Sequence, residues 1–221
     1  SDLGIKIEKY SPEHYSEVVR IFKEGHKGHV KNGIQFGLTS SKVQFVFFLA
    51  FCLGFYSSLD RALLFLAITI LLHIISVFDC FYTYVKYHLG TDMRDRELRF
   101  WTTKPNVFLV AKASGKVVGI VSYQIINPDT AEMNRLGVDY TFRGQEIGIK
   151  LVEECMKLAR KDGYKVMYLE TTSANISAIK LYKKLGYEFL RAKGFRPRSF
   201  GCSFFVNTFS GLHVSAFIKK L

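Results

Sequence analysis

Six consecutive residues, Arg143, Gly144, Gln145, Glu146, Ile147 and Gly148, have the types and spacing of a phosphate-binding turn. An apolar strand pattern ends just before them, and a helix pattern begins within them. The first backbone N–H groups of a helix have no partner inside the helix, and the helix dipole is positive at that end. Such a turn binds phosphate groups, and Arg143 adds a fixed positive charge. The segment therefore predicts a site for a phosphate-rich ligand.

The turn resembles the acetyl-coenzyme A (acetyl-CoA) motif, Q/R-x-x-G-x-G/A, of the GCN5-related N-acetyltransferase (GNAT) superfamily. Arg143 and Gly148 match this motif, whereas Glu146 stands where the first glycine is expected. Like charges 4 Å apart repel by about 1 kcal/mol in water and by about 4 kcal/mol at intermediate dielectric. A Glu146 side chain directed outward would leave the backbone amides free. The resemblance implies acetyl-CoA as co-substrate, bound by a weakened but working turn.

The resemblance also implies roles for residues on either side of the turn. In relatives the preceding strand pairs its backbone with the pantetheine arm, and this role falls to Leu136, Gly137 and Val138, where a backbone N–H would also stabilise an oxyanion. Asn175 occupies the position of an asparagine that contacts the pantetheine. Tyr182 occupies the position of a tyrosine that protonates the departing thiolate, which suits a phenol with a pKa of about 10. The alternative for Tyr182 is a helix residue that packs on the sheet.

The proton acceptor for the amine is defined less sharply. Glu132 occupies the position of a glutamate that relatives use, directly or through water, to take this proton. The alternative is a carboxylate at a strand edge in solvent. Glu170, near the end of the following strand, is a second candidate.

Hydrophobic periodicity predicts an α+β fold in which helices pack on a mixed, mostly antiparallel sheet, as the GNAT resemblance also implies. The expected strands are 5–10, 107–113, 116–126, 131–139, 164–172, 187–191 and 203–209, and the expected helices begin at Ser11 and cover 91–98, 147–161 and 175–185. We expect residues 1–221 to form one domain.

An apolar insert interrupts this pattern between the first helix and the second strand. Residues 43–59 and 62–78 contain no charged side chain, and only Asp60 and Arg61 separate the two arms. Each 17-residue arm is roughly 25 Å long as a helix, so a hairpin at 43–78 enters a bilayer without placing the two charges at its centre. Both flanks are basic, which predicts that both lie in the cytosol. The alternative is a pair of buried helices in a soluble protein.

The composition limits the class of partner. The 221-residue chain carries a formal net charge of +12, which favours anionic partners such as a phosphorylated cofactor or anionic lipid. No nucleic-acid-binding motif is visible, and no N-terminal signal peptide is recognised. The four cysteines, Cys52, Cys80, Cys155 and Cys202, lie far apart, so we expect reduced thiols and no metal site.

Three features together resemble the camello, or N-acetyltransferase 8, family of membrane-bound acetyltransferases. They are the apolar hairpin, the segment 87–95 with its Thr91-Asp92-Met93 core, and the tail at 211–217. The resemblance implies a location in the endoplasmic reticulum membrane. It also implies an acceptor that is the α-amino group of a cysteine S-conjugate, the amine of aspartate or a protein lysine. Basic residues after the hairpin, Arg94, Arg96 and Arg99, are candidates to hold a carboxylate or lipid headgroups.

Two readings of function therefore remain at this stage. The first is an acetyl-CoA-dependent N-acetyltransferase that acts on a small amino-acid-derived amine in preference to a protein lysine. The second is a catalytically impaired membrane scaffold with the same fold, for which Glu146 is the main indication.

Overall fold

The computed structural model describes residues 4–100, 103, 105–194 and 212–221. For residues 96, 99, 100 and 194 the backbone alone is described. Cys202 and the expected strand at 203–209 therefore lie outside the described residues.

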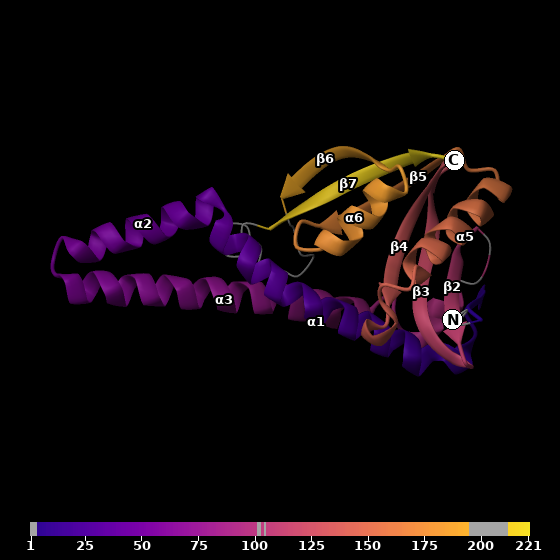
Figure 1. Cartoon of the computed structure of the whole chain (residues 1–221), viewed down its shortest axis with the longest axis horizontal. Coiled ribbons are helices and arrows are strands. Elements are labelled where there is room, and N and C mark those ends of the chain that lie inside the picture. Colours follow the sequence, from indigo (N-terminus) through magenta and orange to yellow (C-terminus); the bar gives the residue numbers. More distant parts are fainter. Residues whose placement is uncertain (1–3, 101–102, 104, 195–211) are drawn as a thin grey trace.

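One sheet of seven strands organises the chain, in the order β1-β2-β3-β4-β5-β7-β6 (Figure 1). The strands are β1 (Lys6–Lys9), β2 (Val107–Ala113), β3 (Lys116–Asn127), β4 (Thr130–Val138), β5 (Val166–Thr172), β6 (Glu188–Gly194) and β7 (His213–Lys220). β4 and β5 pair in parallel, and the other neighbouring strands pair antiparallel. The expected α+β fold with a mixed, mostly antiparallel sheet is confirmed.

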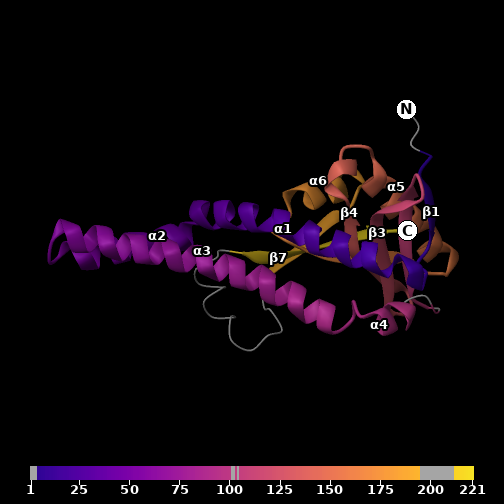
Figure 2. The ribbon, with the colours of Figure 1, turned by 90° about the horizontal axis from the view of Figure 1, so that it is seen from below.

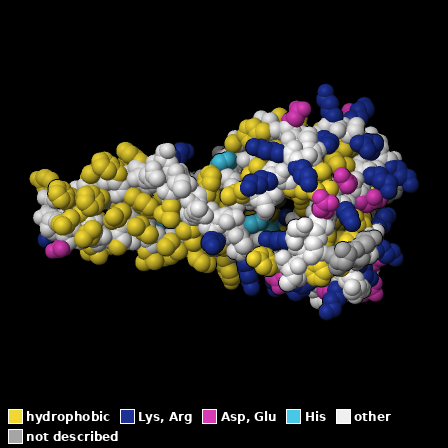
Figure 3. Space-filling view, viewed as in Figure 1, with side chains coloured by type: hydrophobic (Ala, Val, Ile, Leu, Met, Phe, Trp, Pro, Cys, Tyr) yellow, Lys and Arg dark blue, Asp and Glu magenta, His cyan; other side chains and the backbone are white. Residues whose placement is uncertain are grey.

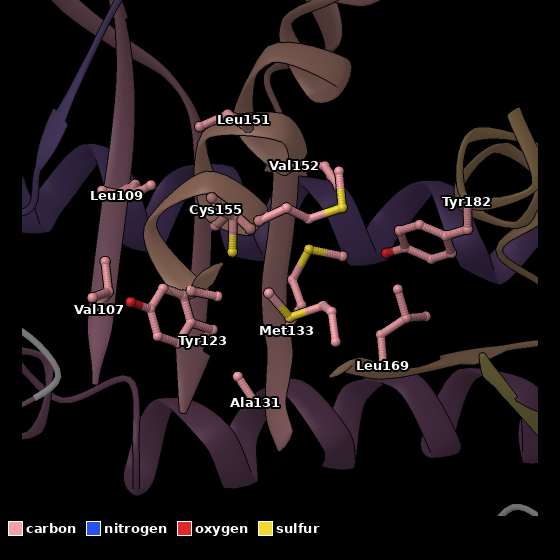
Figure 4. Close-up of a cluster of buried hydrophobic side chains, with 14 of the residues drawn as sticks. Val107, Leu109, Tyr123, Ala131, Met133, Leu151, Val152, Cys155, Leu169 and Tyr182 are labelled. Atoms are coloured by element: carbon pink, nitrogen blue, oxygen red, sulfur yellow. The ribbon is translucent and has the colours of Figure 1, made fainter. Parts of the chain in front are cut away.

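Helices lie on both faces of this sheet, and two of them project away from it (Figure 1). The helices are η1 (Pro12–His14), α1 (Tyr15–Thr39), α2 (Ser41–Phe55), α3 (Leu59–Gly90), α4 (Asp95–Phe100), η2 (Tyr140–Phe142), α5 (Ile147–Lys161) and α6 (Ile176–Lys184). One face carries α5 and α6 over a core that includes Tyr123, Leu151 and Cys155 (Figure 4). The other face carries α1, whose Val18, Ile21 and Phe22 are buried against β2 and β3.

The paired strands β4 and β5 separate halfway along their length. They pair at Thr130–Met133 with Val166–Leu169, and β5 then continues beside β7 alone. A bulge in β4 lies at this point, because Ser122 pairs with Asn134 while Ile120 pairs with Gly137. The extra residue, Arg135, has a left-handed backbone with φ 59°. The bulge twists β4 away from β5 and leaves the edge of β4 beyond residue 133 without a neighbouring strand.

Helices α2 and α3 form the expected hairpin, which projects from the sheet as a rod (Figures 1 and 2). Its turn contains Ser58, whose hydroxyl accepts a hydrogen bond from the Arg61 N–H and caps α3. Apolar side chains cover its surface (Figure 3), and Phe48, Leu53 and Tyr56 are 61%, 71% and 96% exposed. By length and composition α3 can cross a membrane. The helices Pro12–Thr39 and Ser41–Phe55 are bent by 64° at the break between them. They provide a second candidate membrane span only if the two helices together are taken as one span.

Two elements differ from expectation. Strand β7 at His213–Lys220 was not expected, and it lies between β5 and β6, with Ala216 and Phe217 in the core. Helix α3 runs past the apolar arm to Gly90, so the short helix expected at 91–98 begins only at Asp95. The extension of α3 brings polar residues of the hairpin base back to the sheet.

Candidate functional site

A cavity of about 590 Å³ lies where β4 and β5 separate. Its walls come from α1, α3, β4, the turn before α5, and α6. Figure 3 shows a hollow with histidine side chains beside it, near the junction of the hairpin and the sheet. A cavity of this volume is in the range typical of small-molecule and cofactor sites. Because the cavity lies where β4 and β5 separate, unpaired backbone groups of β4 border it.

The start of α5 supplies unpaired backbone donors to the cavity. Gly144 and Glu146 have φ angles of 80° and 60°, and this left-handed turn directs the chain into the helix. The hydrogen bond from Lys150 N to Glu146 O is 3.0 Å, so the N–H groups of Ile147 and Gly148 precede the hydrogen-bond pattern of the helix. Both residues line the cavity, which gives it the positive end of a helix dipole.

The side chains of the turn lie mostly outside the cavity. Arg143 Nε donates to Val138 O at 3.2 Å, and its guanidinium lies 5.4 Å from the centre of the Tyr140 ring. The Gln145 side chain is exposed, and Gln145 does not line the cavity. Arg143 and Gly144 line it, so the turn contributes mainly backbone and one cation.

Glu146 lines the cavity mouth, but its carboxylate is turned toward solvent. The side chain is 66% exposed and lies 3.7 Å from Lys184 Nζ. An ion pair this exposed contributes little to stability. Its left-handed backbone is the conformation a glycine would adopt there, and it costs about 1–2 kcal/mol for a residue with a Cβ. The local fold therefore keeps the glycine-type turn although the residue is glutamate.

The unpaired edge of β4 forms the floor of the cavity through Leu136, Gly137 and Val138. A Cβ added at Gly137 would lie 3.2 Å from Ile21 Cγ2, so α1 approaches β4 more closely there than a larger residue allows. Backbone groups of this stretch that face away from β3 are available to a bound extended group, apart from Val138 O, which accepts the hydrogen bond from Arg143.

Tyr182 and Asn175 reach the cavity from α6. Tyr182 is 5% exposed, and burial followed by the neighbouring Cys155 raises the pKa of its phenol above the ordinary value. Its ring packs 5.7 Å from Tyr187 and 6.1 Å from Phe217, and Figure 4 shows its hydroxyl directed toward the core cluster. Asn175 caps α6, since its Oδ1 accepts a hydrogen bond from Ala178 N at 3.3 Å.

The two expected proton acceptors are placed differently. Glu132 does not line the cavity, and its carboxylate accepts a 2.8 Å hydrogen bond from Gln124 Nε2. Glu170 lines the cavity, and it pairs with Lys193 Nζ at 2.6 Å. Glu132 therefore lies away from the cavity. Its expected role in proton transfer stays a prediction.

Sequence patterns did not reveal the wall formed by α1 and α3. His26 and His29 of α1 and Tyr84 of α3 line the cavity beside Arg135 of β4. Burial lowers the pKa of His26 to about 3 and that of His29 to about 4, with positive neighbours adding to the effect. Both imidazoles are therefore neutral near pH 7. The spacing of His26 and His29 places them on one helix face, but no local pattern indicates that this face borders a cavity.

Arg135 is the buried cation of this wall. Its guanidinium donates to Tyr84 OH at 3.2 Å and to Asp92, and its Nε has no partner among the described residues. Burial raises the pKa of Asp92, but hydrogen bonds from His88 and Arg135 outweigh this and hold it well below its ordinary range. Among the arginines expected to hold a carboxylate, Arg94 is exposed outside the cavity, and the side chains at 96 and 99 are not described.

A helix start with free N–H groups, an unpaired strand edge and a protonated phenol meet at one cavity. Together they define a site for acyl transfer from a phosphate-bearing thioester, because they can hold the phosphate, extend the arm and protonate a thiolate. No group of His, Cys, Asp or Glu residues that could hold a metal ion occurs in the part of the chain that the structure describes.

The model of the Acetyltransferase (GNAT) family matches residues 73–187, more than half of the chain. The chain therefore belongs to the GNAT acetyltransferase family, as its turn predicted. It is an N-acetyltransferase that takes its acetyl group from acetyl-CoA.

Three relatives show the resemblance beyond the family motif. The chain is 28% identical to a probable N-acetyltransferase camello of Xenopus tropicalis over 192 residues, covering 84% of this chain and 86% of that protein. It is 32% identical to an N-acetylaspartate synthetase of Danio rerio, covering 82% of this chain and 66% of that protein. It is 34% identical to human N-acetyltransferase 8B over 48% of each chain. The predicted kinship with the camello and N-acetyltransferase 8 family is confirmed.

Two solved structures share the fold. One is a PaiA N-acetyltransferase from Thermoplasma acidophilum in complex with coenzyme A, with a TM-score of 0.59 and 17% identity over 98% of this chain and 99% of that chain. The other is a GNAT acetyltransferase from Staphylococcus aureus, with a TM-score of 0.58 and 15% identity over the same shares.

Proposed function

We propose that this protein is a membrane-bound N-acetyltransferase that acetylates the primary amine of a small amino-acid-derived molecule, such as a cysteine S-conjugate or aspartate. The observation that carries the proposal is one cavity that joins the predicted acetyl-CoA surfaces to the buried cation Arg135. Arg135 already pairs with Asp92, but its buried Nε has no partner among the described residues, so the guanidinium can donate a further hydrogen bond to the carboxylate of an acceptor. Similarity to an N-acetylaspartate synthetase supports an acceptor of this class.

The donor half of the cavity fits the two ends of acetyl-CoA. The free N–H groups of Ile147 and Gly148 face the position of the pyrophosphate, and Arg143 adds a positive charge nearby. The edge of β4 at 136–138 that faces away from β3 offers hydrogen bonds to the pantetheine arm, and Asn175 lines the same cavity. Acetyl-CoA supplies the activated acetyl group, and these residues hold it in place.

Tyr182 is suited to protonate the departing thiolate. Its hydroxyl stays protonated at neutral pH, because burial raises the pKa of the phenol. A general acid that stays protonated keeps its proton available over the whole physiological pH range. The N–H groups of the β4 edge would stabilise the negative charge that develops on the acetyl oxygen.

The second candidate function, an impaired membrane scaffold, has one observation in its favour. Glu146 places a carboxylate at the mouth of the phosphate-binding turn. Its exposure and its contact with Lys184 favour a weakened site over a dead one, because the charge is screened by solvent and by a lysine.

The α2–α3 hairpin is suited to insert into a bilayer. Apolar side chains cover its surface, and such a large exposed apolar surface is typical of a membrane or protein contact. α2 has 15 residues, roughly 22 Å as a helix, which is shorter than the hydrocarbon core. This length favours a hairpin that enters and leaves from the same side. Basic flanks favour the cytosolic side. The endoplasmic reticulum membrane is the location that the camello resemblance implies.

The test is a screen of acceptors with isotope-labelled acetyl-CoA and purified protein in detergent, read by mass spectrometry. The panel contains aspartate, cysteine S-conjugates, amines without a carboxylate and a lysine peptide. We expect turnover with the carboxylate-bearing α-amines. Turnover of the lysine peptide alone would favour a protein substrate, and no turnover together with no binding of acetyl-CoA would overturn the proposal.

A further inference from the structure

Among the described residues that line the cavity, no carboxylate is free to take a proton from an acceptor amine. The acidic residues of this set are Glu146, which is exposed at the turn, and Glu170, which pairs with Lys193. The unprotonated side chains of the wall opposite α6 are instead two imidazoles, His26 and His29.

The hydrogen bonding of His26 defines its tautomer. Its Nδ1 lies 2.7 Å from Phe22 O. A carbonyl oxygen can only accept a hydrogen bond, so Nδ1 carries the hydrogen. In a neutral ring Nε2 then has a free lone pair and can accept a proton.

The surroundings of His26 keep the ring neutral. Tyr84 of α3 stacks on the ring at 5.1 Å between centroids. Burial lowers the pKa of His26, and the positive charge of Arg135 and the imidazoles of His29 and His88 lower it further. Asp92 is the negative group of this region, and its carboxylate is engaged by His88 and Arg135. The ring is therefore unprotonated throughout the neutral range, and its Nε2 is open to accept a proton.

The position of His26 relates it to the reacting end of the cavity. On α1 it lies one turn beyond Phe22, whose ring is 5.6 Å from the Arg135 guanidinium. It lines the same cavity as Arg135 and as the edge of β4 at 136–138. His26 therefore borders the space in which the thioester and the acceptor would meet.

We propose that His26 is the catalytic residue that takes the proton of the acceptor amine on Nε2, an inference that rests on the proposed acetyl transfer. As the amine nitrogen bonds to the acetyl carbon, its N–H bond breaks and the proton passes to Nε2. The carbon–sulfur bond breaks, and the thiolate receives a proton from Tyr182. The proton on His26 then leaves to solvent, and Tyr182 regains one, so each turnover yields an amide and a thiol.

The test replaces His26 with asparagine, whose amide can still donate to Phe22 O. We expect kcat to fall by about 10²-fold, the lower end of the usual range for a general base, with unchanged affinity for acetyl-CoA. In His26→Ala, added imidazole should restore part of the activity in proportion to its unprotonated fraction. His213→Asn is the matched control, because His213 is half-buried outside the cavity, and it should keep full activity.

A second readout is independent of turnover. ¹⁵N NMR of the histidine rings should show His26 as the neutral Nδ1–H tautomer at pH 7. Three results would each overturn the assignment: full activity in His26→Asn, no imidazole rescue of His26→Ala, or an Nε2–H or doubly protonated ring. A loss of activity in Glu132→Gln with His26→Asn still active would assign the role to Glu132. Failure of the proposed function is separate, since the unmodified protein would then acetylate no amine.

Discussion

At the scale of single residues, Glu146 and Tyr182 set the quality of the donor site in opposite ways. Glu146 holds a strained backbone and brings a negative charge to a phosphate-binding turn. Tyr182 is buried and its phenol is protonated, so its ability to donate a proton depends on the direction of its hydroxyl and not on pH. In the proposed reaction, the first residue would control how tightly the donor is bound, and the second would control how fast the thiolate leaves.

Replacing Glu146 with glycine should tighten binding of acetyl-CoA. The change removes the carboxylate and relieves a backbone conformation that costs about 1–2 kcal/mol. We expect the Kd for acetyl-CoA, measured by calorimetry, to fall roughly 5-fold, corresponding to about 1 kcal/mol of repulsion. Glu146→Gln removes the charge and keeps the strain, so it separates the two causes. An equal Kd in all three proteins would show that the carboxylate does not reach the phosphate.

Tyr182→Phe should lower kcat by about 10²-fold or more while leaving the Kd for acetyl-CoA unchanged. Because burial raises the pKa of the phenol, the acid form persists as pH rises, and Tyr182 should cause no loss of kcat between pH 7 and 9. Tyr187→Phe is the matched control, since Tyr187 is equally buried but does not line the cavity. Equal kcat values for the two variants would remove Tyr182 from the reaction.

At the scale of elements, local patterns predicted those parts whose structure depends on neighbours in sequence. The limits of α5 follow from its apolar face and the glycines around it, and the limits of β2 from a buried run between turns. The α1–α3 wall depends on packing between helices more than forty residues apart, as in the stacking of His26 on Tyr84. Sequence patterns could not reveal it. For the same reason the position of Glu132 outside the cavity was hidden, because the cavity lies beside the later part of β4, where the strand leaves β5.

The packing of α1 against α3 should make the protein sensitive to mild acid. The folded-state pKa values of His26 and His29, about 3 and about 4, lie below the unfolded value of 6.5. The unfolded chain therefore binds more protons below pH 6.5, and the free energy of unfolding falls as the pH decreases toward 4.

We expect a loss of about 2 kcal/mol per histidine between pH 7.5 and pH 5, measured by denaturant unfolding. The double variant His26→Asn, His29→Asn should lose correspondingly less stability over this interval. An identical pH dependence in the variant and the unmodified protein would contradict the burial of these rings.

At the scale of the whole molecule, a basic catalytic domain and an apolar rod share one continuous helix. α3 begins at the hairpin turn and ends beside Arg135, so the segment proposed to enter the bilayer also supplies Tyr84 to the cavity. The acceptor side of the cavity therefore lies close to the expected membrane surface. An amine substrate would enter from this side, near the lipid headgroups.

Cysteine labelling in sealed microsomes tests this arrangement and its orientation together. Cys52 lies on α2 and is exposed in the protein alone, so lipid should shield it from a membrane-impermeant maleimide. Lys157→Cys, at a position 72% exposed on α5, should react rapidly from the cytosolic side. Rapid labelling of Cys52 in intact vesicles would contradict insertion of the hairpin. Labelling of the Lys157→Cys variant only after the membrane is permeabilised would place the catalytic domain in the lumen, because both ends of the hairpin lie on the side of that domain.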